Sequence, residues 1–162
     1  MLSGKYILVQ LLNLKQNLPL VNTHFQGQQE FTPKHIYFRK IKLKADKSMP
    51  LVLSEFGGYS LATKGHIFNL SKAYGYGKTE SREEFTKALE DLYRYEVIPA
   101  IKEAGLCATV LTQLSDVEDE INGLVTYDRA VEKADAAALR QVAKELKEAF
   151  ASQLNETNEK SH

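Results

Sequence analysis

The chain has 162 residues, 43% of them hydrophobic, and its 21 basic residues balance 21 acidic ones, so the formal net charge is zero. This balance gives no electrostatic footprint for a nucleic acid or an anionic membrane, and we expect neither as a partner. No apolar stretch approaches the roughly 20 residues of a transmembrane helix, and the single cysteine, Cys107, excludes an internal disulfide.

The N-terminal segment, residues 1–24, carries no pattern that we assign to a domain. Within it, residues 6–14 are apolar enough for a strand or a short helix. The stretch lacks the small-residue cleavage site of a signal peptide. We therefore expect a cytoplasmic protein.

Three short apolar runs predict strands at residues 35–38, 51–54 and 106–111. The middle run shows no polar alternation, which is typical of a strand buried on both faces in a parallel sheet covered by helices. The pattern predicts an α/β fold. The first two runs are joined by a basic connector, which we interpret as a solvated face, with Lys40, Lys42, Lys44 and Lys47.

Two helices are predicted after the second strand. Ser81 opens the first as the cap of a capping box, Pro99 should kink or end it, and Gly105 should terminate the region. Its buried stripe should consist of Phe85, Leu89, Leu92 and Tyr93. The second begins near Asp135, and the polar tail at residues 155–162 should fray. Its buried stripe should consist of Leu139, Val142, Leu146 and Phe150.

One carboxylate, Glu55, stands where the middle apolar run meets a glycine turn. The C-terminal rim of such a strand is where barrel and open α/β enzymes place their chemistry. Gly57 and Gly58 would let the backbone turn sharply and leave room for a ligand. The alternative is a strand-ending glutamate that caps a helix or pairs with a lysine.

Two motifs carry a resemblance to a known family. The sequence PLVLSEFGGY at residues 50–59, followed by CATVLTQLSDVEDEINGLVTYDR at residues 107–129, resembles the C-terminal part of the catalytic (β/α)8 barrel of glycoside hydrolase family 2. This family contains β-galactosidases and β-glucuronidases. The resemblance implies that residues 25–154 are a partial barrel domain, comprising about strands six to eight with their helices.

The same resemblance implies a fragment of a retaining β-glycosidase that hydrolyses O-glycosidic bonds, with Glu55 as the nucleophile and no cofactor or metal. The acid/base glutamate of the family follows an asparagine at the end of strand four, and the Asn-Glu pairs of this chain lie only in the tail. The expected partners are a carbohydrate and an upstream chain that completes the barrel. The alternative function is a non-catalytic α/β remnant or interaction module, such as the product of a broken gene.

Five further residues are candidates for substrate binding: His35, Tyr37, Tyr59, His66 and Gln113. His35 and Tyr37 flank strand six, where the family contributes sugar contacts, although a histidine in an apolar strand is also typical of a satisfied core residue. Tyr59 could stack on a sugar face. His66 could reach the sugar or only the carbonyls of its own loop, and Gln113 ends strand eight.

The loop after strand eight is acidic, and its carboxylates are either substitute acids or, as we favour, caps that hydrogen-bond the loop. Asp116 resembles a cap. Asn122 and Gly123 predict a turn that needs a positive φ. Tyr127 and Asp128 should lock the loop in place.

Overall fold

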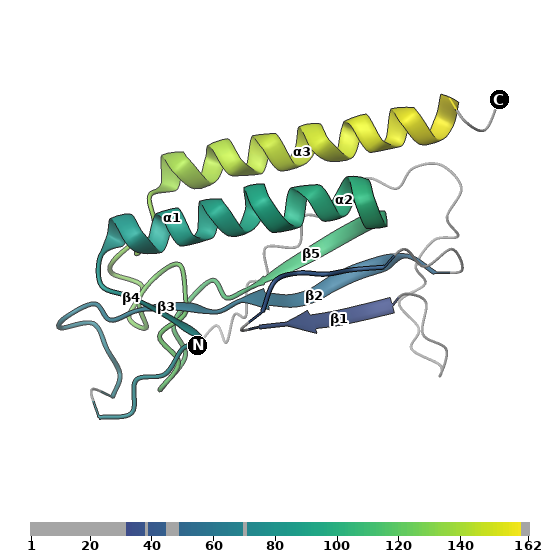
Figure 1. The fold of residues 1–162 in the computed structure, drawn as a ribbon. Coiled ribbons are helices and arrows are strands. Elements are labelled where there is room, and N and C mark those ends of the chain that lie inside the picture. Colours follow the sequence, from purple (N-terminus) through teal and green to yellow (C-terminus); the bar gives the residue numbers. More distant parts are fainter. Residues whose placement is uncertain (1–31, 38, 45–48, 70, 160–162) are drawn as a thin grey trace.

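The computed structural model describes residues 32–37, 39–44, 49–69 and 71–159, and the expectations for residues 1–24 lie outside this part of the chain. Figure 1 shows a sheet with the long helices stacked on one side of it. The elements in chain order are β1 (Thr32–Ile36), β2 (Leu51–Gly57), β3 (Tyr59–Leu61), β4 (Gly77–Thr79), α1 (Arg82–Leu92), the π-helical turn η1 (Tyr93–Val97), α2 (Ile98–Ala104), β5 (Leu106–Thr112) and α3 (Ala136–Glu159).

The main sheet has three strands in the order β1–β2–β5, and both neighbouring pairs are parallel. Ile36 pairs with Phe56, and Gly57 pairs with Thr112, so the three strands end at the same edge. Strands β3 and β4 form a separate parallel pair beyond that edge. The predicted α/β class is confirmed, as a small parallel sheet with helices.

The strand boundaries differ from the predicted ones, most clearly for β1. It begins at Thr32 and ends at Ile36, whereas the apolar pattern predicted a start at His35. The Thr32 N–H donates to the Pro50 carbonyl at 2.9 Å, so pairing with β2 extends the strand into polar residues. The apolar pattern could not show this, because the pairing partner supplies the extension.

Helices α1, η1 and α2 form one continuous helical rod that begins as predicted at Ser81. The Ser81 hydroxyl accepts a hydrogen bond from the Glu84 N–H at 3.1 Å. The Glu84 carboxylate in turn accepts a hydrogen bond from the N–H of Glu80, and not from that of Ser81 as in a standard capping box. The predicted apolar stripe is confirmed, because its four members are all buried.

Pro99 does not end this rod. A proline lacks an N–H and crowds the carbonyl four residues before it. In the wider turn of η1, the Ile98 N–H bonds to the carbonyl of Tyr93, five residues back, so the chain expands just before the proline. The rod then ends at Gly105, which has the left-handed φ of 69° expected of a helix-terminating glycine.

Helix α3 packs on this rod and is capped by Asp135, whose carboxylate accepts from the N–H groups of Ala137 and Ala138. Helix α3 continues to Glu159, into the polar tail that was expected to fray from residue 155. Adding turns to a formed helix is far easier than starting one. In the part of the chain that the structure describes, no helix is both long and apolar enough to span a bilayer.

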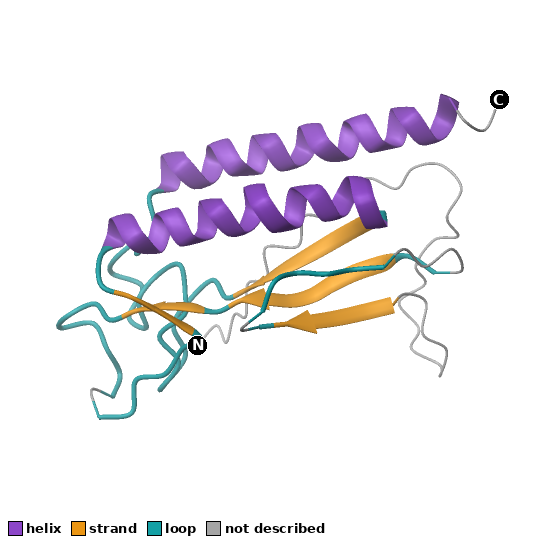
Figure 2. Cartoon of the chain, viewed as in Figure 1, coloured by secondary structure: helices purple, strands orange, loops and turns teal. Residues whose placement is uncertain are grey.

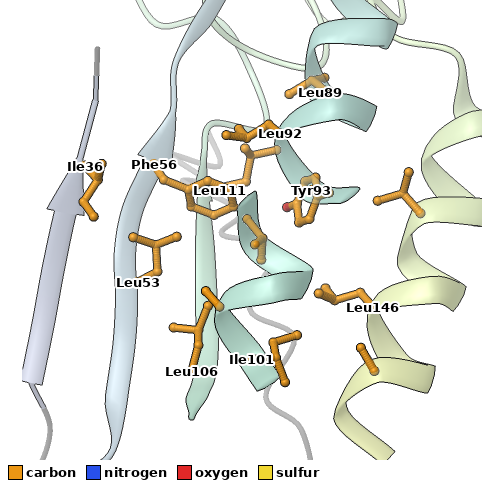
Figure 3. Close-up of a cluster of buried hydrophobic side chains, with 14 of the residues drawn as sticks. Ile36, Leu53, Phe56, Leu89, Leu92, Tyr93, Ile101, Leu106, Leu111 and Leu146 are labelled. Atoms are coloured by element: carbon orange, nitrogen blue, oxygen red, sulfur yellow. The ribbon is translucent and has the colours of Figure 1, made fainter. Parts of the chain in front are cut away.

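The hydrophobic core lies between the sheet and the helices, as Figure 3 shows. Leu53 and Phe56 of β2 are fully buried, and the Phe56 ring meets the Tyr93 ring edge-on at 5.5 Å. The opposite face of β2 was predicted to be buried as well, but Val52 is only half-buried. The long helices of the described residues all lie on one side of the sheet, so within that part of the chain no helix covers the second face (Figure 2).

Candidate active site

The carboxyl ends of the three parallel strands bring four of the predicted site residues to one edge. Glu55 lies two residues before the end of the central strand β2, and His35 on β1 is its register partner. Tyr37 follows the last residue of β1, and Gln113 follows the last residue of β5. This is the edge at which parallel α/β proteins assemble ligand sites.

The Glu55 carboxylate is half-exposed and is held through one of its two oxygens. The Tyr37 hydroxyl donates to Oε2 at 3.1 Å, and Nδ1 of His35 lies 3.5 Å from the same atom. Within the described part of the chain, no hydrogen bond to Oε1 is found. The His35 side chain is 57% exposed, so the interpretation as a core histidine is wrong.

Tyr37 links all three strand ends. Its ring stacks on that of Tyr76 with centroids 4.2 Å apart and planes 11° from parallel. Its hydroxyl lies 2.9 Å from the Thr112 hydroxyl on β5 and bonds Glu55 on β2. Burial raises the pKa of Tyr37 to about 12; the Thr112 hydrogen bond opposes this rise, and Glu55 adds to it. Tyr37 therefore stays protonated, as a hydrogen-bond donor, through the neutral pH range.

The glycine turn after Glu55 makes room for an aromatic ring, and room for a ligand beside Glu55 stays a prediction. Both Gly57 and Gly58 have positive φ, 89° and 74°. A Cβ on Gly58 would overlap the Tyr76 ring, and a Cβ on Gly57 would come within 2.6 Å of the Leu111 side chain. Gly58 thus seats the ring on which Tyr37 stacks.

Tyr59 lies in β3 and lines a hollow of about 400 Å³ together with Tyr37 and Tyr76. Its ring packs over Gly77, where a Cβ would come within 2.6 Å of it. Burial is the main cause that raises the pKa of Tyr59, so its hydroxyl also remains protonated. Tyr37 is the link between this hollow and Glu55, because it lines the first and bonds the second.

His66 is paired within the protein. Its Nδ1 lies 2.7 Å from Oδ2 of Asp128, which joins the loop after β3 to the loop after β5. Hydrogen bonds from the Thr126 hydroxyl, then from His66 and the Ala130 N–H, hold the pKa of Asp128 well below its usual range. Of the two roles foreseen for His66, contact with its loop carbonyls is replaced by this pair, and contact with a sugar stays a prediction.

Gln113 turns toward the loop that follows it. Its Nε2 donates to Oδ1 of Asn122 at 2.6 Å and to Oε2 of Glu120 at 3.1 Å. The loop itself is tied across the strand edge, since the Leu61 N–H donates to the carbonyl of Ile121 at 3.2 Å. The segment from β5 to α3 is therefore tied to β3, beyond the end of the sheet at which Glu55 lies.

A buried ion pair anchors this loop. Lys133 Nζ bonds Oδ1 of Asp116 at 2.7 Å, with the two side chains 0% and 2% exposed. Asp116 also accepts from the Gly123 N–H at 2.7 Å, which agrees with its predicted capping role. The predicted positive φ at Gly123 is wrong; that glycine is needed because a Cβ would overlap the backbone of Ser115 and Asp116.

Two residues at the site, Thr112 and Tyr76, were not predicted to contact Tyr37 beside Glu55. Thr112 had only its position at the end of a strand as a signal. Tyr76 had a better one, a glycine on each side in a sequence rich in tyrosine, which is a pattern that leaves space around a ring. In the described ranges, no group of three or more histidine, cysteine, aspartate and glutamate side chains is placed to hold a metal ion.

Comparison with known proteins adds no relative to this picture. No protein-family model matches the chain, and no curated protein matches it.

Proposed function

We propose that this chain is part of the catalytic (β/α)8 barrel of a retaining β-glycosidase similar to β-galactosidases and β-glucuronidases, with Glu55 as the nucleophile. The observation that carries the proposal is the carboxylate of Glu55 at the carboxyl end of a central parallel strand, held through Oε2 with no hydrogen bond to Oε1 from the described residues. On this proposal β1, β2 and β5 are strands six, seven and eight.

The chemistry fits the position. A retaining glycosidase uses one carboxylate to attack the anomeric carbon while a second carboxyl group protonates the leaving oxygen. An attacking carboxylate must be fixed in direction and open on one side. Tyr37 and His35 meet only Oε2, so Oε1 is the oxygen that we assign to the attack.

The second carboxyl group would come from outside the described residues. The only Asn-Glu pairs of the chain lie at residues 155–159, within α3. Figure 1 places that end of α3 away from the edge at which the strands end. We propose that a preceding barrel segment, in the same polypeptide or a separate one, supplies the acid/base.

The sheet supports such a partner. Strands β1 and β5 are the two outer strands of the sheet, and each pairs on one side only within the described part of the chain. Edge strands present unpaired backbone groups that readily accept another strand. A closed barrel of eight strands would use both edges and would cover the half-buried Val52 face. On sequence grounds we place the assembled protein in the cytoplasm.

A non-catalytic interaction module is the second candidate. The two edge strands also favour it, because within the described residues each pairs on one side only and could bind a strand of any partner without chemistry at Glu55. The two candidates differ in whether the Glu55 carboxylate matters.

Hydrolysis of a panel of aryl β-glycosides separates them. The chain alone should give negligible turnover, since loss of proton donation to the leaving group alone costs about 10²–10⁴-fold. Co-expression with the segment encoded upstream should restore turnover, and Glu55→Gln should abolish it. Equal turnover by the Glu55→Gln complex, or none by any complex that assembles, would favour the interaction module.

A further inference from the structure

The Tyr37 hydroxyl has two hydrogen-bonding neighbours but only one proton. Its oxygen lies 3.1 Å from Oε2 of Glu55 and 2.9 Å from Oγ1 of Thr112. It can donate to one of them and must accept from the other. The direction of each bond follows from what the neighbours are able to do.

Only one arrangement uses every group. A carboxylate accepts and does not donate, whereas a threonine hydroxyl does either. Thr112 therefore donates to Tyr37, and Tyr37 donates to Glu55. The influences on the pKa of Tyr37 agree: the Thr112 bond lowers it, as a donor to a phenolate does, and the Glu55 bond raises it.

The phenol is also fixed in space. Stacking on Tyr76 limits rotation of the Tyr37 ring, and Tyr76 is seated over Gly58. The Tyr76 N–H donates to the Gly58 carbonyl at 2.8 Å, which fixes that loop to the turn after β2. When the ring is held in this way, one further hydrogen bond is enough to fix the direction of the hydroxyl proton.

We propose that Thr112 is a positioning residue whose hydroxyl, by donating to Tyr37, directs the Tyr37 proton onto Oε2 of Glu55. A donor that itself accepts a hydrogen bond is a stronger donor, because hydrogen bonds in a chain polarise one another. The three-residue chain spans the ends of β5, β1 and β2. The choice of Oε1 as the attacking oxygen rests on the proposed function, whereas the direction of the chain does not.

The test is the pKa of Tyr37, measured by NMR on the full chain with tyrosine labelled at the ring carbon bonded to oxygen. The chain has 8 tyrosines, and Tyr37→Phe identifies the signal. Glu55→Gln should lower the pKa from about 12. In that background, where the titration falls at more accessible pH, Thr112→Val should raise it by about one unit, the tenfold change that an ordinary hydrogen bond supplies.

Thr112→Ser keeps a donor and should leave the pKa unchanged. Thr112→Ala removes the donor with less bulk than valine and should repeat the valine result if the valine variant does not fold. A lower or unchanged pKa in the donor-deleting variants would overturn the proposed direction, and so would an unchanged pKa in Glu55→Gln. No glycoside is involved, so failure of the proposed function leaves this result intact, and the reverse also holds.

Discussion

Breaking the buried ion pair of Lys133 and Asp116 should destabilise the loop beside the candidate site more than any other single substitution proposed here. Lys133 bonds the Asp116 carboxylate at 2.7 Å and the Ile121 carbonyl at 2.8 Å, and it lies 5.5 Å from the centre of the Phe85 ring. Burial lowers the pKa of Lys133 and raises that of Asp116, so each charge depends on the other for its stability. Asp116→Asn removes the negative charge and keeps an oxygen that can accept from Gly123.

The expected loss follows from burial. Breaking a fully buried ion pair by removing one partner costs about 3–5 kcal/mol, because the remaining charge stays away from water. For a chain of this size about 2–4 °C of Tm corresponds to each kcal/mol. Asp116→Asn should therefore lower Tm by roughly 6–20 °C. The exposed pair of Lys87 and Asp91 is the control, since an exposed pair one helical turn apart contributes only about 0.3–0.5 kcal/mol.

Urea titration and thermal melting of the full chain, followed by circular dichroism, measure both effects. Asp91→Asn should be nearly neutral. The double variant Asp116→Asn/Lys133→Met should recover most of the loss, because it leaves no charge unpaired. A cost of Asp116→Asn below about 1 kcal/mol, or a double variant no more stable than the single one, would contradict the role assigned to this ion pair.

Three smaller perturbations test other parts of the molecule. Gly58→Ala should destabilise the chain by about 1–2 kcal/mol for its positive φ, plus about 1–3 kcal/mol for the overlap of the new Cβ with the Tyr76 ring. Gly65 also has a positive φ but lies in open space, so Gly65→Ala should show only the first cost when both variants are unfolded in urea. Ser81→Ala should cost about 1 kcal/mol as the loss of a helix cap, and Ser81→Asp should not. Because the folded pKa of Asp128 is depressed, its stabilisation is complete above the unfolded pKa near 4 and falls away as the pH drops below it. The urea midpoint of the wild type should thus fall more steeply with acid than that of Asp128→Asn, and parallel curves would contradict the assignment.

The sequence predicted the parts of the fold that depend on local pattern. The strands at β2 and β5, the cap at Ser81 and the buried stripe of α1 all follow from residues close together in the chain. Of the stripe predicted for α3, Val142, Leu146 and Phe150 are buried, and Leu139 is partly buried. The start of β1 at Thr32 did not, because it depends on pairing with residues before β2. The π-helical turn was missed for a related reason: Pro99 indicates that the helix must adjust but not how.

For the candidate site as well, the local sequence predicted some features and missed those that depend on distant residues. A carboxylate at a strand end predicted the place of Glu55, and the parallel sheet brought Tyr37 beside it. The hydrogen-bond partners of the site residues could not be predicted from local sequence, because Tyr37 and Thr112 are 75 residues apart and His66 and Asp128 are 62 apart. The positive φ predicted at Gly123 was wrong, because that glycine is needed to admit the backbone of Asp116, and the Tyr76 ring that Gly58 admits was equally hidden from the local pattern.

The most direct test of the central claim is covalent trapping of the nucleophile. 2-Deoxy-2-fluoro-β-glycosides with a dinitrophenyl leaving group need no acid catalyst, and their slow hydrolysis lets a glycosyl–enzyme ester accumulate. The chain, assembled with the segment that completes the barrel, should gain one sugar, located on Glu55 by peptide mass spectrometry and absent from Glu55→Gln. A sugar on another carboxylate such as Glu120, or none in an assembled complex, would contradict the assignment of Glu55 as the nucleophile.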